Sequence, residues 1–414
     1  MRFPLVVVTL GVGAMGCGGS GSEGSFSGPL RVLALNHQSA CVADASGELY
    51  CWGNSLTIPG MEVSSGSDNI CVDPFVPANG GGPLDDCITN GSLRVPTDVR
   101  FKKVSRQTAI ADDGQLYMWP YWEGLPTTCD PQNEVCVPGV GPAADASMRF
   151  KDVAEFDGGW CGLTTDGAGY CRWRRYDPTG TQNTLWDPPI AFGAGQTFEK
   201  ISVSGNALVV VDAAGKAFRA TLGYVSGTEQ WMVTSPSPWE PDRTFTEVEV
   251  NHRYAIPSQV AGGTAVCGLT DGGTVVCDGM NEMGQRGNGT VSPIGMEDAS
   301  PTAVAGLPPM AGLAVGNRHY CAVAANGDVY CWGRSNEGQT GHAMQIECAL
   351  PEPGLTHYCS PTPAKVTDIP PMKRIEASIQ FTCGETMDGE VWCWGLNDLG
   401  QIGEPGANGK VVVN

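Results

Sequence analysis

The sequence predicts an all-β chain that closes into a seven-bladed β-propeller with disulfide-stapled hairpins. Three observations lead to this prediction: one hairpin unit occurs seven times, its second strand is apolar on both faces, and the composition favours short strands joined by turns. The 414 residues include 57 Gly, 30 Pro and 11 Trp, and 41% of them are hydrophobic. Because similar units in a ring bury one another, a chain of this length can form a single domain.

The repeating unit is marked by two cysteines separated by ten residues, with a glycine six positions after the first. Two further segments, 108–118 and 209–219, have the glycine but no cysteine at either end. Seven units result. The cysteine pairs and their glycines are Cys41 and Cys51 with Gly47, Cys161 and Cys171 with Gly167, Cys267 and Cys277 with Gly273, Cys321 and Cys331 with Gly327, and Cys383 and Cys393 with Gly389; the two units without cysteines have Gly114 and Gly215.

Each pair is predicted to be a disulfide across a β-hairpin. The two units without cysteines lack both members together, as a bonded pair predicts. Folding the segment 321–331 about Asn326 places its cysteines opposite each other and leaves a three-residue loop, 325–327. Such a loop needs a left-handed residue at its last position, which glycine adopts at least cost. Opposed residues of antiparallel strands have Cα atoms about 4.5–5.5 Å apart, within reach of a disulfide.

The second strand of the hairpin is apolar on both faces. In Leu49-Tyr50-Cys51-Trp52, alternate side chains point to opposite faces, and the segments 329–332 and 391–394 repeat this pattern. A sheet of this kind must be covered on both sides, as a propeller blade is by its two neighbours. The tryptophans are therefore predicted to pack between blades rather than to stack on a ligand.

Residues 1–16 are predicted to be an export signal, because Arg2 is followed by a short apolar run that is too short to span a bilayer. The segment ends in Ala-Met-Gly-Cys, which resembles the bacterial lipobox. Cys17 is therefore predicted to carry the lipid and to become the mature N-terminus. Residues 17–28, rich in Gly and Ser, would form a flexible tether. The alternative is an ordinary signal peptide that is cut nearby.

Sixteen cysteines remain besides Cys17, an even number that favours a disulfide framework in an exported chain. Six of them form three close couples in loop-like stretches and are also predicted to be bonded. These spacings lack the Cys-x-x-Cys pattern of zinc sites, so neither a metal nor another cofactor is predicted. The three couples are Cys71 with Cys87, Cys129 with Cys136 and Cys348 with Cys359.

The charge balance argues against nucleic acid as a partner. The chain has 24 Lys and Arg against 44 Asp and Glu, a formal net charge of -20. Nucleic-acid binding depends on cations that neutralise phosphates. We expect a monomer with no nucleic-acid partner.

Three hairpins continue with the tail Gly-Gln-x-Gly, which lies at 284–287, 338–341 and 400–403. With the strand before it, this tail resembles the regulator of chromosome condensation repeat family, whose signature is a Gly-x-Val-Tyr-x-Trp-Gly strand, an Asn and then Gly-Gln-x-Gly. Segments 327–341 and 389–403 match best. The resemblance covers residues 29–414, weakly from 53 to 260, and implies a seven-bladed propeller over that range.

Two departures from the signature stand out. Ser335 occupies the Asn position in the first of these segments, and segment 273–287 keeps Asn281 but has Asp278 where the family has Trp. The exchange-factor role of the family's namesake is not carried over, because this chain has an export signal and bridged cysteines. Exported bacterial members of this fold include a β-lactamase inhibitor protein that grips another protein with one rim. The resemblance therefore implies protein binding.

No catalytic motif is present in the sequence, which has neither a Gly-x-Ser-x-Gly elbow nor a His-Glu-x-x-His pair. His319, two residues before Cys321, resembles a structural histidine of the family. No enzyme is predicted. A lyase or glycosidase with a site in the central channel stays open as an alternative, which facing carboxylates and a metal in the channel would favour.

Function is predicted to lie in three long connections, 54–100, 120–150 and 342–371, each of which contains one of the loop couples. If they leave their hairpins at the same strand end, they share one rim. Exposed aromatic residues on ordered loops are typical interface anchors. The alternative is that they fold back to cap the ring. The candidate binding residues are Phe75, Trp119, Tyr121, Trp122 and Tyr358.

The sequence thus predicts a lipoprotein scaffold on the outer membrane or cell surface of a bacterium, touching the membrane only through its lipid. It would bind a protein or cell-envelope partner through the loops. A secreted inhibitor or effector with one protein target is the other alternative.

Overall fold

The computed structural model describes most of the chain from residue 29 onward. The described ranges are 29–36, 39–54, 88–95, 97–106, 108–118, 127–130, 135–138, 141–142, 147–156, 158–176, 184–225, 230–251, 264–293, 295–343, 346–348, 356–397, 400–402 and 411–413. The predicted signal 1–16, Cys17 and the tether 17–28 lie outside them. Among the described residues there is no helix long and apolar enough to cross a membrane.

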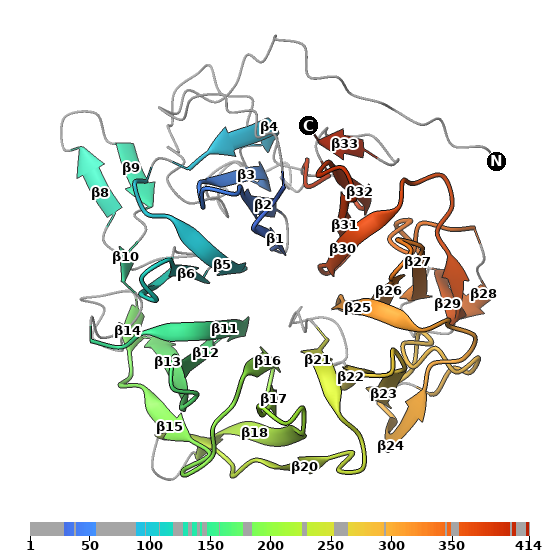
Figure 1. The fold of residues 1–414 in the computed structure, drawn as a ribbon, viewed down its shortest axis with the longest axis horizontal. Coiled ribbons are helices and arrows are strands. Elements are labelled where there is room, and N and C mark those ends of the chain that lie inside the picture. Colours follow the sequence, from blue (N-terminus) through green and yellow to red (C-terminus); the bar gives the residue numbers. More distant parts are fainter. Residues whose placement is uncertain are drawn as a thin grey trace, which may run out of the picture.

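The described strands form seven antiparallel sheets arranged around a central opening (Figure 1). The prediction of an all-β, seven-bladed propeller is confirmed. We number the sheets as blades 1 to 7 in chain order. In each blade the first strand lies nearest the opening, and the second and third strands lie successively farther out.

Blades 1 to 4 are formed by consecutive stretches of the chain. Blade 1 contains β1 (Val32–Leu35), β2 (Ser39–Ala43), β3 (Leu49–Asn54) and β4 (Ile88–Arg94). Blade 2 contains β5 (Phe101–Ser105), β6 (Thr108–Ala111), β7 (Leu116–Met118) and β10 (Gly141–Pro142), with β8 (Thr127–Asp130) and β9 (Val135–Pro138) as a separate ribbon. Blade 3 contains β11 (Phe150–Phe156), β12 (Gly159–Thr164), β13 (Gly169–Tyr176), β14 (Thr184–Trp186) and β15 (Ile190–Phe192). Blade 4 contains β16 (Lys200–Ser204), β17 (Ala207–Val211), β18 (Ala217–Val225), β19 (Gln230–Val233) and β20 (Ser237–Trp239).

The remaining three blades also begin with three consecutive strands, and in blade 6 the last strand in sequence pairs with the third. Blade 5 contains β21 (Phe245–Val250), β22 (Ala265–Thr270), β23 (Val275–Met280) and β24 (Glu297–Ala303). Blade 6 contains β25 (Met310–Val315), β26 (His319–Ala324), β27 (Val329–Arg334), β28 (Ile346–Cys348) and β29 (His357–Lys365). Blade 7 contains β30 (Met372–Ala377), β31 (Phe381–Thr386), β32 (Val391–Gly395) and β33 (Val411–Val413).

The repeated hairpin is formed by the second and third strands of each blade. In blade 6 the Ala324 amide donates to the Asp328 carbonyl at 2.9 Å, and the Gly327 amide donates to the Ala324 carbonyl at 2.8 Å. This is the predicted three-residue loop, and Gly327 has the expected left-handed φ of 86°. The equivalent glycine of the other six hairpins also has a positive φ.

The two cysteines of each hairpin pair are direct neighbours across the strands, and their sulfur atoms lie at bonding distance. All ten occupy the positions that the sequence predicted. The register pairs Cys41 with Cys51, Cys161 with Cys171, Cys267 with Cys277, Cys321 with Cys331 and Cys383 with Cys393.

The Cα atoms of these pairs are 4.0–4.2 Å apart, slightly less than expected. Counting back from the Ala324–Asp328 hydrogen bond, Cys321 and Cys331 occupy a non-hydrogen-bonded pair, where opposed Cα atoms approach most closely. In the units without cysteines, the same register pairs Thr108 with Met118 and Val209 with Arg219.

Each junction between neighbouring blades contains its own buried apolar cluster, so the described core is a ring of seven such clusters. In blade 1, Cys51 packs toward blade 2, whereas Trp52 packs toward Phe381 of blade 7. The cysteine face of one blade thus meets the tryptophan face of the next. The prediction that neighbouring blades cover both faces is confirmed.

Candidate functional site

The Gly-Gln-x-Gly tails join neighbouring blades. The indole of Trp332 in blade 6 donates to the Gln285 carbonyl of blade 5 at 2.7 Å. Trp394 of blade 7 makes the same bond to the Gln339 carbonyl of blade 6, at 3.0 Å. Trp52 donates to the Gln401 carbonyl at 3.2 Å, which links the first blade to the last.

The last glycine of the tail is required by this contact. A Cβ on Gly287 would lie 2.6 Å from Val304 and 3.0 Å from the indole nitrogen of Trp332. Gly341 meets Val366 and Trp394 in the same way. A larger residue at either position would push the neighbouring blade away, so these motif residues are explained by packing.

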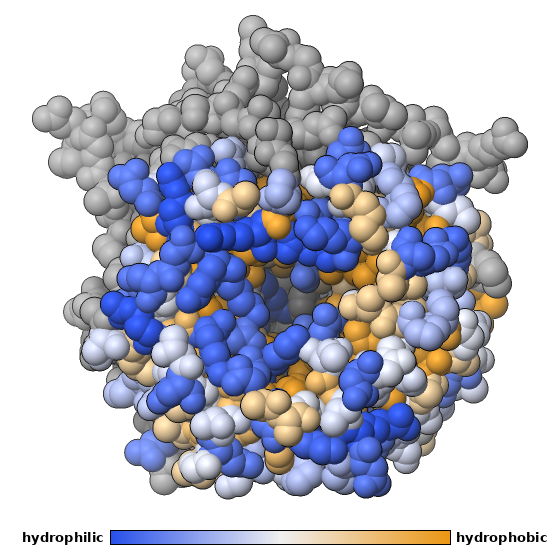
Figure 2. Space-filling view, in the orientation of Figure 1, coloured by the Kyte–Doolittle hydropathy of each residue, from blue (hydrophilic) through white to orange (hydrophobic). Residues whose placement is uncertain are grey.

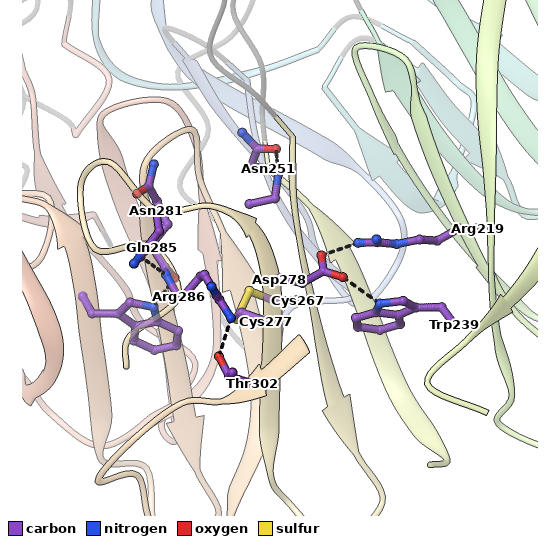
Figure 3. The surroundings of a disulfide bond; sticks show 12 residues. Arg219, Trp239, Asn251, Cys267, Cys277, Asp278, Asn281, Gln285, Arg286 and Thr302 are labelled. Carbon is purple, nitrogen blue, oxygen red and sulfur yellow. Dashed lines mark hydrogen bonds and ion pairs between the residues drawn. A yellow bond between two sulfur atoms is a disulfide. The ribbon is translucent and has the colours of Figure 1, made fainter. Parts of the chain in front are cut away.

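The junction of blades 4 and 5 departs from this pattern. Asp278, at the tryptophan position of blade 5, is buried and accepts a hydrogen bond from the Trp239 indole at 2.9 Å (Figure 3). It also pairs with Arg219. Burial raises the pKa of Asp278, and the positive charge of Arg219 opposes that shift. Here the indole comes from the preceding blade and the acceptor from the following one, the reverse of the three junctions described above.

His319 is a structural residue, as the sequence suggested. Its ring is fully buried, and Nε2 lies 2.9 Å from the Thr382 hydroxyl of blade 7. Burial lowers the pKa of His319 to about 3, so the ring is neutral at physiological pH. It therefore joins blades 6 and 7.

The three long connections that were predicted to carry function all follow the third strand of a blade, and each contains the next strand of that blade. They follow β3, β7 and β27. Because equivalent strands run in the same direction around the ring, these connections begin on the same rim, which we call rim A. The connections between first and second strands also lie there, whereas the hairpin turns lie on the opposite rim.

Four of the five predicted binding residues, Phe75, Trp119, Tyr121 and Trp122, lie outside the described residues. Tyr358 lies on rim A with 38% of its surface exposed. Its backbone is held by Asn336, whose Oδ1 accepts from the Tyr358 amide at 2.9 Å.

The third loop couple packs on the neighbouring blade. The sulfur atoms of Cys348 and Cys359 lie at bonding distance, and both residues cluster with Met283 of blade 5. This part of the connection therefore folds back on the ring, as the capping alternative expected, while Tyr358 stays exposed. In the β8–β9 ribbon, Cys129 is directly opposite Cys136 in the strand register. Cys71 and Cys87 lie outside the described residues.

Exposed apolar side chains gather on rim A. Of the seven large apolar residues that are exposed among the described ones, six belong to third-to-fourth strand connections or to the strand ends beside them. Only Met387, in the hairpin turn of blade 7, lies on the opposite rim. The six on rim A are Tyr224, Met232, Val291, Met296, Ile346 and Tyr358.

Blades 3 and 4 contribute to rim A in a way that the sequence analysis missed. β13 and β18 run past their hairpin partners, and each pairs its far end with a short strand, β14 or β19. The resulting ribbons carry Tyr224, 51% exposed, and Met232, 41% exposed. Neither of these two connections contains a cysteine couple, so the cysteine spacing did not indicate them. The aromatic residues of this region and the arginines of 172–175 were a signal that could have found it.

The central opening is bordered largely by hydrophilic side chains (Figure 2). An innermost strand has no neighbour on its channel side, so its free amides need acceptors. Side chains of the preceding blade supply them. Asp152 of blade 3 accepts from the Ile201 amide at 3.0 Å, and Glu247 of blade 5 accepts from the Leu313 amide at 2.8 Å. Asp152 also pairs with Lys103 of blade 2.

Two further carboxylates of the inner strands carry shifted pKa values. Burial and the nearby charge of Glu247 raise the pKa of Glu249 to about 7. Burial and the charge of Glu249 raise the pKa of Glu376 to about 8. Neighbouring carboxylates are thus present on the inner strands, which is one of the two features that a lyase or glycosidase site in the channel would need. Within the described ranges, no group of three or more His, Cys, Asp or Glu residues is arranged to hold a metal ion.

The sequence model of the regulator of chromosome condensation (RCC1) repeat matches residues 311–339, which run through the first three strands of blade 6 to Gln339. The chain is 32% identical over 99 residues to human E3 ubiquitin-protein ligase HERC2, a match that covers 23% of this chain and 2% of HERC2. It is 30% identical over 135 residues to the Ultraviolet-B receptor UVR8 of Arabidopsis thaliana, covering 32% of this chain and 28% of UVR8. The matched segments therefore span a minor part of both relatives.

Solved structures with the same fold cover nearly the whole chain. Yeast RCC1 (Prp20), in its complex with Kap60, superposes with a TM-score of 0.52 at 14% identity, covering 93% of this chain and 75% of that one. Human WBSCR16 superposes with a TM-score of 0.56 at 14% identity, covering 86% of each chain. At such identities the likeness concerns the fold. Together with the repeat match, it shows that the chain has the propeller fold of RCC1 and contains a segment similar to the RCC1 repeat at residues 311–339.

Proposed function

We propose that this protein is an exported, lipid-anchored scaffold that binds a protein partner through rim A. The observation that carries the proposal is the gathering of six exposed apolar side chains on that rim. Exposed apolar groups that cluster on one face of a soluble domain are typical of interaction sites. The opposite rim contributes only Met387 among the described residues.

The fold supports this choice. The repeated hairpins serve as a frame, and the connections on rim A differ in length and composition from blade to blade. The yeast relative is itself seen in a complex with another protein, Kap60. Disulfides in the hairpins and loops suit an oxidising compartment outside the cytoplasm.

Site-specific photo-crosslinking in the producing cells tests the rim. A benzoylphenylalanine placed at Tyr224 or Tyr358 is expected to give adducts of one discrete mass. The same probe at Met387, which is 51% exposed like Tyr224, is the matched control and should give none. Adducts from Met387 alone, or equal adducts from all three positions, would show that rim A is not the binding side.

The lipid anchor is tested separately. Cys17→Ala should abolish labelling by radioactive palmitate and leave the precursor uncut, because the diacylated thiol is the substrate of processing. Ser22→Ala in the same Gly/Ser stretch is the control and should be labelled and cut normally. Normal processing of Cys17→Ala would mean that the chain is exported without a lipid.

A further inference from the structure

We propose that the ring of blades opens at the junction of blades 7 and 1, and that Glu385 and Arg374 form a clasp that keeps this junction closed. The opening requires no partner and is independent of the proposed function. Two features point to it. One is the path of the chain through the blades, and the other is a buried carboxylate at a position that is apolar in the other six blades.

Among the described blades, the junction of blades 7 and 1 is the one that no link of the chain crosses. Each sheet is built from one continuous stretch of chain, so each of the other junctions is spanned by a short connection, such as 304–309 or 366–371. No described strand of blade 1 pairs with a strand of blade 7. A short link keeps two blades within reach of each other after their contacts break. Blades 7 and 1 have no such link and can therefore separate farthest.

Contacts between side chains and backbone hold this junction. Trp52 of blade 1 donates to the Gln401 carbonyl, and its ring lies in the same buried cluster as Phe381 of blade 7. The Ser378 hydroxyl of blade 7 donates to the Asn36 carbonyl of blade 1. In the part of the chain that the structure describes, the ring is therefore closed by noncovalent contacts alone.

A buried carboxylate of blade 7 adds a clasp to these contacts. Glu385 of β31 is fully buried, and its Oε1 accepts from the Leu30 amide, just before β1, at 3.2 Å. Its Oε2 accepts from Arg374 Nε at 2.5 Å, and Lys373 Nζ donates to Oε1 at 3.1 Å. Arg374 also donates to the Leu30 carbonyl at 2.7 Å and to the Arg31 carbonyl at 3.0 Å. Glu385 and Arg374 thus hold both the amide and the carbonyl of the residue at which the chain enters blade 1.

The position of Glu385 is apolar in every other blade. It lies two residues after the first cysteine position of the hairpin, on the face that packs toward the next blade. A buried carboxylate loses more hydration energy than an apolar side chain, so its partners must offset that cost. The carboxylate occurs at the junction without a link, where bonds to the entering chain replace a connection. The equivalent residues of blades 1 to 6 are Ala43, Ile110, Leu163, Val211, Leu269 and Val323.

Opening at this junction separates blades 1 and 7 while the other junctions stay packed, because each junction has its own apolar cluster. Val42 of blade 1 is buried in the cluster shared with blade 7 and would become accessible. Ala322 occupies the equivalent position of blade 6 and is buried against blade 5. Both are fully buried, and each lies opposite a tyrosine, Tyr50 or Tyr330. They form a matched pair that reports on one unlinked and one linked junction.

Cysteine alkylation measures the opening in the protein with its disulfides formed. Val42→Cys and Ala322→Cys are treated separately with iodoacetamide without denaturant, and peptide mapping follows alkylation of the new thiol. The rate at position 42 is expected to be about tenfold or more above that at position 322 and to change little in dilute urea, because partial opening exposes less surface than unfolding. Equal rates with the same steep urea dependence would overturn the proposal, since only global unfolding would then expose either site. Ala40→Cys, in the same cluster as Val42, repeats the measurement if Val42→Cys does not fold.

The clasp is tested by adding Glu385→Gln to Val42→Cys. Glutamine keeps an acceptor for the Leu30 amide but loses the charge that holds Arg374. Alkylation should become about tenfold faster, as expected when a hydrogen bond between charged groups is lost. Arg374→Gln should act in the same direction. Unchanged alkylation in both variants would show that these residues do not form a clasp.

The matched control removes a similar carboxylate contact at a linked junction. Glu247 accepts from the Leu313 amide across the junction of blades 5 and 6, which the connection 304–309 spans. Glu247→Gln is expected to leave alkylation of Ala322→Cys unchanged within about twofold, because the link keeps the two blades together. An acceleration there as large as the one that Glu385→Gln causes at position 42 would contradict the role given to the missing link.

Discussion

The junction of blades 5 and 6 and the junction of blades 4 and 5 are both closed by an indole hydrogen bond, but the bond runs in opposite directions along the chain. At the first, Trp332 of the following blade donates to the Gln285 carbonyl of the preceding one. At the second, Trp239 of the preceding blade donates to Asp278 of the following one. At both junctions a buried indole donates to an acceptor of the neighbouring blade, and either blade can supply the indole.

The reversal at blades 4 and 5 involves several coupled changes. Blade 4 has no Gly-Gln-x-Gly tail to offer a carbonyl. Its second cysteine position is Arg219, which faces blade 5 and pairs with Asp278 (Figure 3). An aspartate alone at this buried position would be costly, and a lone arginine on that face would lack a partner. The absence of the cysteine pair in blade 4 and the absence of the tryptophan in blade 5 are therefore coupled, because Arg219 and Asp278 take these positions and pair with each other.

The largest effect is expected from breaking the exceptional junction. Asp278→Ala leaves the Trp239 indole and the Arg219 guanidinium without their shared acceptor and should lower the free energy of unfolding by about 3 kcal/mol. Urea denaturation measures the loss. The control is Asp328→Ala, which removes an ion pair to Lys365 at the surface and should cost less than about 1 kcal/mol. Equal losses in the two variants would contradict the role given to Asp278.

A somewhat smaller loss is expected when the hairpin bond of a regular blade is removed. Cys321→Ala combined with Cys331→Ala should lower the free energy of unfolding by about 2–3 kcal/mol, because the short loop is no longer closed in the unfolded chain. Urea denaturation with and without reductant measures it. The double variant should be insensitive to any reduction at this site. Free thiols at both positions in parent protein produced under oxidising conditions would rule out the bond.

Removing the indole donors one at a time compares the junction of blades 4 and 5 with the two regular junctions directly. Trp332→Phe and Trp394→Phe should each cost about 1 kcal/mol beyond the packing change, because a neutral hydrogen bond is lost. Trp239→Phe should cost more, about 2 kcal/mol, since its acceptor is the carboxylate of Asp278. Denaturation of the three variants under one condition ranks them. A ranking with Trp239→Phe last would mean that Arg219 alone satisfies the aspartate.

A last effect, which depends on pH, is expected from the carboxylates of the inner strands. The pKa values of Glu249 and Glu376 are raised to about 7 and about 8. Between pH 5 and pH 8 the unfolded chain releases these protons before the folded chain does. Stability should therefore decrease as pH rises through this window and level off above it.

Thermal unfolding at a series of pH values measures this dependence. Glu376→Gln should flatten the decline, because it removes one of the two like charges. Asp242→Asn, on an exposed surface turn, is the control and should leave the slope unchanged. A parent protein whose stability rises from pH 5 to pH 8 would contradict the sign.

Much of the architecture could be predicted because its determinants are local. The ten-residue cysteine spacing and its glycine define the hairpin, and Gly327 adopts the left-handed φ that the loop requires. The alternation in Leu49-Tyr50-Cys51-Trp52 indicated two buried faces, which blades 7 and 2 cover. The position of Tyr358 on rim A followed from the strand order.

The candidate site was predicted only in part. The connections that leave β3, β7 and β27 were recognised from their length and cysteines, and the topology brings their starting points to one rim. The stacking of Trp173 of blade 3 on Trp231 of blade 4 was not recognised, because the two residues belong to different repeats. Periodicity within a repeat says nothing about which rings meet across a junction.

The sequence by itself determined the fold class, the number of blades, the hairpin register and the face that each hairpin side chain occupies. These depend on spacing and alternation along one short stretch of chain. The tertiary structure decided which groups meet between blades: Asp278 with Arg219 and Trp239, Trp52 with the Gln401 carbonyl, and Glu249 beside Glu376. The physical reason is that donor, acceptor and charge act over a few ångströms. Only closure of the ring brings residues from separate repeats within that distance.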